Sequence, residues 1–141
     1  MTADFEIKKQ KVVHTWAAWS LVQGSFSDPL GNDFTRTYVS SPGAVGVVAL
    51  LGEKSARQVI LVNQYRPPFN EKTLEIPAGM RDKQGEDSVV TARRELEEEA
   101  GFTAGTLLSI GSHESAPGIS NARVDLFLAA DLVETKVDRH G

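Results

Sequence analysis

Three glutamates, Glu95, Glu98 and Glu99, are the residues whose type and spacing could do chemistry. Spacings of three and four residues make them neighbours on the surface of a helix. Like charges placed this way repel by roughly 0.2–0.5 kcal/mol per pair, so a positive group should compensate them. Mg²⁺ fits, because it binds through one or two carboxylates together with substrate phosphates. A solvated acidic face is the alternative, and for a glutamate run alone it is the more frequent one.

The helix that must carry these glutamates has a clear start and a clear end. Asp87 or Ser88 can act as its N-cap, and Gly101 suits the left-handed position that follows a helix. Glu95 and Glu99 flank an apolar stripe, so we expect both to point along the protein surface into a cleft. The stripe has spacings of three and four and consists of Val89, Ala92, Leu96 and Ala100.

This stretch resembles the Nudix box, G-x5-E-x7-R-E-U-x-E-E-x-G-U, where U is a bulky apolar residue. Every fixed position from Glu86 onward is met, whereas six residues instead of five separate Gly79 from Glu86. The extra residue falls in the loop before the helix, where insertions are tolerated best. The matching residues are Gly79, Glu86, Arg94, Glu95, Leu96, Glu98, Glu99, Gly101 and Phe102. The resemblance implies an enzyme that hydrolyses a nucleoside diphosphate linked to another moiety.

Features outside the box resemble the ADP-ribose pyrophosphatase branch of that family. Pro117 lies 16 residues after Gly101, a distance typical of this branch, and the segments 63–68 and 74–79 are similar to it as well. This resemblance implies Mg²⁺-dependent hydrolysis of ADP-ribose, or a related ADP-sugar, to AMP and ribose 5-phosphate. Other nucleoside diphosphate derivatives such as NADH stay open as substrates, as does a non-catalytic module that binds a nucleotide.

The resemblance also implies a role for each matching residue. The backbone carbonyl of Ala78 and the carboxylates of Glu95 and Glu99 would bind Mg²⁺, with Mn²⁺ as an alternative metal. Glu98 would support them, and Arg94 would orient the glutamates or touch a phosphate. For Glu86 a metal role and a favourable charge at the helix N-terminus are equally good explanations.

Arg66 is expected to contact a phosphate, because its planar fork matches phosphate oxygens; a surface salt bridge is the alternative. Tyr38 matches a position that stacks on adenine in related enzymes, and Trp19 or Trp16 could form a second face. Pro117 is expected to line the same substrate site. In related enzymes the N-terminal arm reaches across a homodimer, so the resemblance implies a homodimer here.

Composition and charge exclude several classes of function. The chain has 141 residues, of which 40% are hydrophobic, which suits one compact domain with a small appendage. A net charge of −4 gives no electrostatic case for binding nucleic acid or anionic membranes. There is no cysteine, so disulfides and thiolate chemistry are excluded. The absence of a signal-like or membrane-spanning run makes a cytoplasmic protein the expectation.

The chain divides into a β-rich arm, residues 1–42, and a Nudix domain, residues 43–141. In the arm we expect strands at 11–16, 18–23 and 34–39, with a turn at 27–33. Continuous apolar runs at 44–51 and 58–65 predict strands buried on both faces. Strands at 106–114 and 123–130 are expected after the helix. The fold class is therefore α/β, and the resemblance implies a Nudix α/β/α sandwich with an N-terminal arm.

The C-terminal part of such a domain is expected to be missing from this sequence. Related domains continue for several dozen residues with another strand and a helix. Their general base is a glutamate in a loop beyond the strand that ends here near Ala130, a position that falls at or beyond Gly141. Glu134 and Asp138 are the remaining acids, and neither is assigned as the base.

Overall fold

The computed structural model describes residues 4–135, which form two compact units. The first unit contains the chain up to Pro42 together with Glu114–Ala122. The second contains Gly43–His113 and the chain from Arg123 onward. Each unit has its own sheet.

The first unit is built on a three-stranded antiparallel sheet with the order β1-β2-β3. The strands are β1 (Glu6–Trp16), β2 (Trp19–Ser27) and β3 (Asp33–Ser40). The turn predicted after Ser27 is confirmed, and one carboxylate oxygen of Asp28 accepts the N–H groups of Leu30 and Asn32. Val22 on the central strand is buried, whereas every residue of β1 is exposed, so this sheet has little core of its own.

The loop 114–122 belongs to the first unit because it is hydrogen-bonded to β3. The N–H of Val39 donates to the Ile119 carbonyl at 2.8 Å, and the N–H of Asn121 donates back to the Val39 carbonyl at 3.2 Å. The side chain of Asn121 accepts a third bond, from the N–H of Ser41. These bonds fix the loop against the strand that carries Tyr38.

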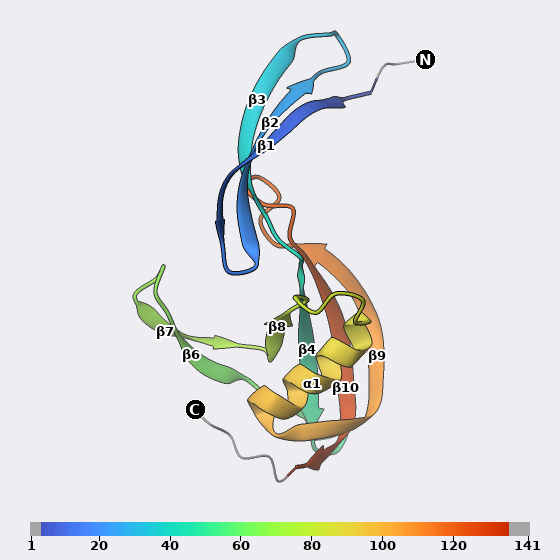
Figure 1. Cartoon of the computed structure of the whole chain (residues 1–141). Coiled ribbons are helices and arrows are strands. Elements are labelled where there is room, and N and C mark those ends of the chain that lie inside the picture. Colours follow the sequence, from blue (N-terminus) through green and yellow to red (C-terminus); the bar gives the residue numbers. More distant parts are fainter. Residues whose placement is uncertain (1–3, 136–141) are drawn as a thin grey trace. The chain divides into compact units, whose positions relative to one another are not determined.

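The second unit is built on a five-stranded sheet with the order β5-β4-β10-β9, in which β8 also pairs with β4. The strands are β4 (Ala44–Leu51), β5 (Gln58–Val59), β8 (Ala78–Met80), β9 (Phe102–Glu114) and β10 (Arg123–Glu134). Figure 1 shows β4 and β10 side by side, and they run parallel with Val124 opposite Ala44 and Ala129 opposite Ala49. Parallel strands of this kind are apolar on both faces, as β4 is.

The predicted helix is confirmed and covers this sheet. It begins as α1 (Ser88–Glu95), with Asp87 at the N-cap, and continues over Leu96–Ala100 as a wider turn of the i→i+5 type. Gly101 ends it in the left-handed conformation, with φ 75°. The predicted stripe packs on the strands, where Ala92, Leu96 and Ala100 form one core with Val45, Val47, Ala49, Phe127 and Ala129. The α/β fold class is thus confirmed (Figure 1).

The prediction of one buried strand over 58–65 is wrong. The run is divided between β5 and β6 (Val62–Arg66), and β6 pairs with β7 (Glu71–Glu75) in a separate two-stranded hairpin. Val59, Leu61 and Tyr65 are about half exposed. The apolar pattern predicted one continuous strand, but β5 pairs with only the last two residues of β4, after which the chain leaves the sheet.

The last strand is longer than predicted and continues past Ala130 to Glu134. Asp131 interrupts it locally with φ 52°, and its carboxylate accepts a hydrogen bond from the Thr106 hydroxyl at 2.7 Å. Glu134 therefore lies exposed on a strand instead of in a loop, and Asp138 lies outside the described residues. Within residues 4–135, no helix combines the length and the apolar character needed to span a membrane.

Candidate active site

Two of the predicted metal ligands, Glu95 and Glu99, lie beside the short strand β8. Glu95 is only 9% exposed although it carries a carboxylate. Glu99, in the wide turn, accepts a hydrogen bond from the backbone N–H of Ala78 at 3.0 Å. Ala78 pairs with Gly46 of β4, so the sheet fixes the backbone that the carboxylate contacts. The structure therefore brings Ala78 and Glu99 together, as the sequence analysis expected.

Burial makes the charged forms of the Glu95 and Glu99 carboxylates less favourable than they are in water. Burial raises the pKa of Glu95 above its ordinary value, and the negative charge of Glu99 raises it further. Burial also raises the pKa of Glu99, whereas the Ala78 N–H and the positive charge of Arg66 act in the opposite direction. Both pKa shifts mean that the charged forms of Glu95 and Glu99 are unfavourable side by side. A divalent cation between them would reduce their repulsion.

The donor set suits a hard cation that also binds phosphate. No group of three or more His, Asp or Glu side chains with the arrangement of a complete metal site occurs within residues 4–135. Two carboxylates and a carbonyl are nevertheless what Mg²⁺ requires of a protein when waters and substrate phosphates supply its remaining ligands. The residues present therefore fit the metal that the glutamate spacing predicts.

Arg94 connects three carboxylates at the edge of this site. Its guanidinium lies 3.0 Å from Glu86, 3.1 Å from Glu95 and 3.6 Å from Glu98. Glu86 also accepts a hydrogen bond from the Thr91 hydroxyl at 2.7 Å, and these two partners lower the pKa of Glu86. Glu86 is thus held in an ion pair, while Glu98 is exposed. Arg94 is thus within hydrogen-bonding distance of Glu95, and its role toward the glutamates or a phosphate stays a prediction.

Gly79 is required at its position by the side chain of Glu95. A Cβ atom added to Gly79 would come within 2.6 Å of Cγ of Glu95 and would overlap its carboxyl group. Only glycine lets the glutamate pass so close to the backbone of β8. The glycine of the box is therefore explained by side-chain packing at the site, and its φ is not in the left-handed region.

Arg66 ends β6 and is held by a residue that the sequence analysis did not single out. Its Nε and Nη2 atoms donate to the two carboxylate oxygens of Glu75 at 2.8 and 2.6 Å. Thr73 donates to the same carboxylate at 2.5 Å. These bonds lower the pKa of Glu75 to about 2, so the pair stays charged at neutral pH. The sequence analysis missed Glu75 because its contact with Arg66 depends on the pairing of β6 with β7.

Tyr38 and Pro117, far apart in sequence, line one cavity of about 390 Å³ in the first unit. The Tyr38 hydroxyl accepts a hydrogen bond from the Gln10 side chain at 2.9 Å. Trp19 does not line this cavity and instead lies 6.0 Å from the ring of Trp16. The full lining is Arg36, Thr37, Tyr38, Pro117, Gly118, Ser120 and Asn121.

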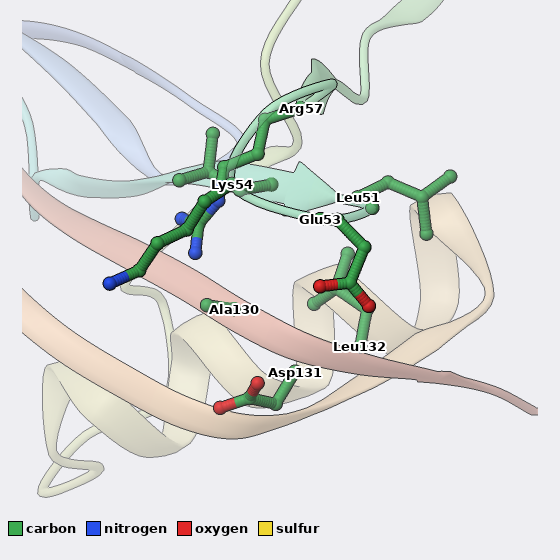
Figure 2. Close-up of a pocket in the computed structure, with 9 residues that line it drawn as sticks. Leu51, Glu53, Lys54, Arg57, Ala130, Asp131 and Leu132 are labelled. Atoms are coloured by element: carbon green, nitrogen blue, oxygen red, sulfur yellow. The ribbon is translucent and has the colours of Figure 1, made fainter.

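A second cavity, of about 490 Å³, lies in the other unit between the segment after β4 and strand β10. Figure 2 shows Lys54, Arg57 and Glu53 on that segment and Asp131 on β10. It lies at the opposite end of β4 from β8, and none of the predicted site residues lines it.

Comparison with known proteins gives a consistent picture. A family model for the NUDIX domain matches residues 41–138. The chain is 42% identical to the ADP-ribose pyrophosphatase of Bacillus subtilis over 104 residues, which cover 74% of this chain and 54% of that protein. It is 36% identical to the ADP-ribose pyrophosphatase of Mycobacterium tuberculosis over 131 residues, which cover 93% of this chain and 62% of that protein.

A solved structure of an ADP compounds hydrolase has the same fold, with a TM-score of 0.81 at 20% identity. The match covers all of this chain and 75% of that one. The chain spans only about half to three-fifths of the length of the two pyrophosphatases. The matching domain model and these identities show that the chain belongs to the Nudix family.

Proposed function

We propose that this chain performs Mg²⁺-dependent hydrolysis of the diphosphate bond of ADP-ribose or a related ADP-sugar. The observation that carries the proposal is the pair of carboxylates on the helix beside β8: Glu95 is buried and paired with Arg94, and Glu99 is half-buried and bonded to the backbone N–H of Ala78. The names of the two similar pyrophosphatases support ADP-ribose as the substrate.

In this proposal each group has a separate task. Glu95, Glu99 and the carbonyl of Ala78 would hold Mg²⁺ or Mn²⁺. Such a metal would supply charge neutralisation for the diphosphate and would lower the pKa of a water molecule. Arg94 keeps Glu95 in place, Glu98 supports the cluster from the surface, and Arg66 donates to a phosphate oxygen. Water adds to one phosphorus as the bridging P–O bond breaks, which yields AMP and ribose 5-phosphate.

We assign the adenine to the cavity of Tyr38 and Pro117, whose aromatic ring and polar lining suit a base. Trp19 does not line this cavity, so we do not assign it a contact with the base there. The proposed location of the protein is the cytoplasm.

We further propose that the arm, residues 1–42, mediates a homodimer. The edge strand β1 supports this, because its apolar side chains Ile7, Val12 and Val13 are more than half exposed. Sedimentation equilibrium is expected to give twice the mass of the chain. A monomer at the concentration used for turnover would contradict the dimer.

Turnover of a substrate panel tests the proposed activity. We expect the chain to convert ADP-ribose to AMP with Mg²⁺, to do so faster than NADH or UDP-glucose, and to stop when EDTA removes the metal. Chromatography of the products provides the measurement. Faster turnover of NADH or UDP-glucose would identify that compound, instead of ADP-ribose, as the preferred substrate. Tight binding of ADP-ribose without turnover would instead identify a nucleotide-binding module.

A further inference from the structure

The hairpin that presents Arg66 has little packing to hold a long side chain still. Strands β6 and β7 pair only with each other, and most of their residues are exposed or half-buried. A free arginine on such a surface would lose side-chain entropy on becoming fixed. A group that fixes it before substrate arrives would remove that cost from binding.

Glu75 is the residue that fixes Arg66. Its carboxylate accepts hydrogen bonds from Nε and Nη2, which lie on one side of the guanidinium. A further hydrogen bond, from the Thr73 hydroxyl, keeps the carboxylate in place. A guanidinium has five N–H groups, of which this pairing uses two. The Nη1 group and the outer edge of the fork are therefore left to bind a second anion in the bidentate manner that phosphate favours.

The pair also lies close to the carboxylate site. Glu75 and Ala78 are three positions apart along the chain, so their Cα atoms are at most about 11 Å apart. The charge of Arg66 is near enough to Glu99 to lower its pKa, and the charge of Glu75 is near enough to raise it. The guanidinium of Arg66 is therefore bonded to Glu75 and is within electrostatic range of Glu99 in the proposed metal site.

We propose that Glu75 is a positioning residue that orients the guanidinium of Arg66 toward the diphosphate of a nucleoside diphosphate substrate. The identity of that substrate rests on the proposed function, whereas the orientation of Arg66 does not. Glu75 itself carries a negative charge, so by charge alone it would repel a diphosphate. If charge repulsion dominates, neutralising Glu75 should strengthen diphosphate binding. If the orientation of Arg66 dominates, neutralising Glu75 should weaken it.

Binding of inorganic pyrophosphate with Mg²⁺ to Glu75→Gln decides between the two effects. We expect the dissociation constant to rise about tenfold, the size found when a group that supports a binding residue is lost. Glu71→Gln is the matched control: Glu71 is exposed and lies opposite Arg66 in the ladder, so its neutralisation removes an equal charge beside Arg66, whereas the guanidinium bonds to Glu75 stay in place. An unchanged or lower dissociation constant in Glu75→Gln would overturn the proposal.

An exchanged pair separates positioning from simple support of the hairpin. In the double variant Arg66→Glu and Glu75→Arg the ion pair can re-form, but the guanidinium now starts from β7. If Glu75 positions Arg66, the thermal midpoint of the double variant should return toward that of the parent, while its affinity for pyrophosphate should stay weak. Recovery of both would show that Glu75 only stabilises the hairpin.

Turnover gives a further readout in the same variants. Glu75→Gln is expected to raise KM for ADP-ribose and leave kcat within about twofold, because Arg66 holds the ground state and the transition state alike. A parent that binds pyrophosphate but does not hydrolyse ADP-ribose would refute the proposed function and leave the role of Glu75 standing. A parent that does not bind pyrophosphate would refute the role of Glu75.

Discussion

Replacing Glu99 by glutamine is expected to reduce Mg²⁺-dependent turnover of ADP-ribose by at least about a hundredfold. That is the upper end of the loss seen when a group that merely supports a metal ligand is removed, and Glu99 is proposed as a ligand itself. The amide keeps the size of the side chain and an oxygen that can accept from the Ala78 N–H. Loss of the charge is therefore the main change.

Stability distinguishes loss of the metal site from damage to the fold. Burial raises the pKa of Glu99, which means that its charged form is unfavourable in the folded protein. Glu99→Gln should then be at least as stable as the parent when the metal is removed with EDTA. Added Mg²⁺ should raise the thermal midpoint of the parent and leave that of the variant unchanged, since only the parent binds it well.

Glu97→Gln is the control for this experiment. Glu97 lies on the same turn, and its charge is not among those that shift the pKa of Glu95 or Glu99. It should retain parental turnover and the parental response to Mg²⁺. Turnover in Glu99→Gln within a few fold of the parent would rule out Glu99 as a metal ligand.

Replacing Gly79 by alanine is expected to reduce turnover by about a hundredfold, because displacing a reacting group by 1 Å can cost that much. The new methyl group would occupy the space of the Glu95 carboxyl group, so either the side chain or β8 must move. The variant should also be less stable by about 1–3 kcal/mol, the usual cost of overpacking a tight site. Thermal unfolding and turnover provide the two measurements.

A second substitution identifies the cause of that loss. Shortening Glu95 to alanine in the Gly79→Ala background removes the atoms that clash, so the stability should return toward that of Glu95→Ala alone. Turnover should stay low, because the carboxylate is gone. If Gly79→Ala were as active and as stable as the parent, the close packing of Glu95 on β8 would be wrong.

The sequence predicted the helix and its glutamates because both depend on local rules. The N-cap at Asp87, the apolar stripe and the glycine after the helix each act within a few residues. The same locality gave the turn at Asp28. These features need no knowledge of which strand pairs with which.

Features that depend on strand pairing were the ones that could not be predicted. The run 58–65 has the composition of a buried strand, yet β4 offers pairing partners to only its first two residues. The bond between Arg66 and Glu75 requires the register of β6 with β7. The cavity of Tyr38 and Pro117 was expected only from the family resemblance, because it requires the loop after β9 to bond to β3. Each of these contacts joins segments whose pairing no local pattern specifies.

The parallel pairing of β4 with β10 has a consequence for the order of folding. The ladder joins residues 80 positions apart, so its formation must overcome the entropy of closing a long loop. Helix α1 and strand β8 can meet β4 earlier, because all three lie before Gly101 in the chain. Phe127 and Ala129 of β10 nevertheless complete the core beneath the helix. The helix that carries the glutamates therefore has its complete apolar support only once β10 has docked.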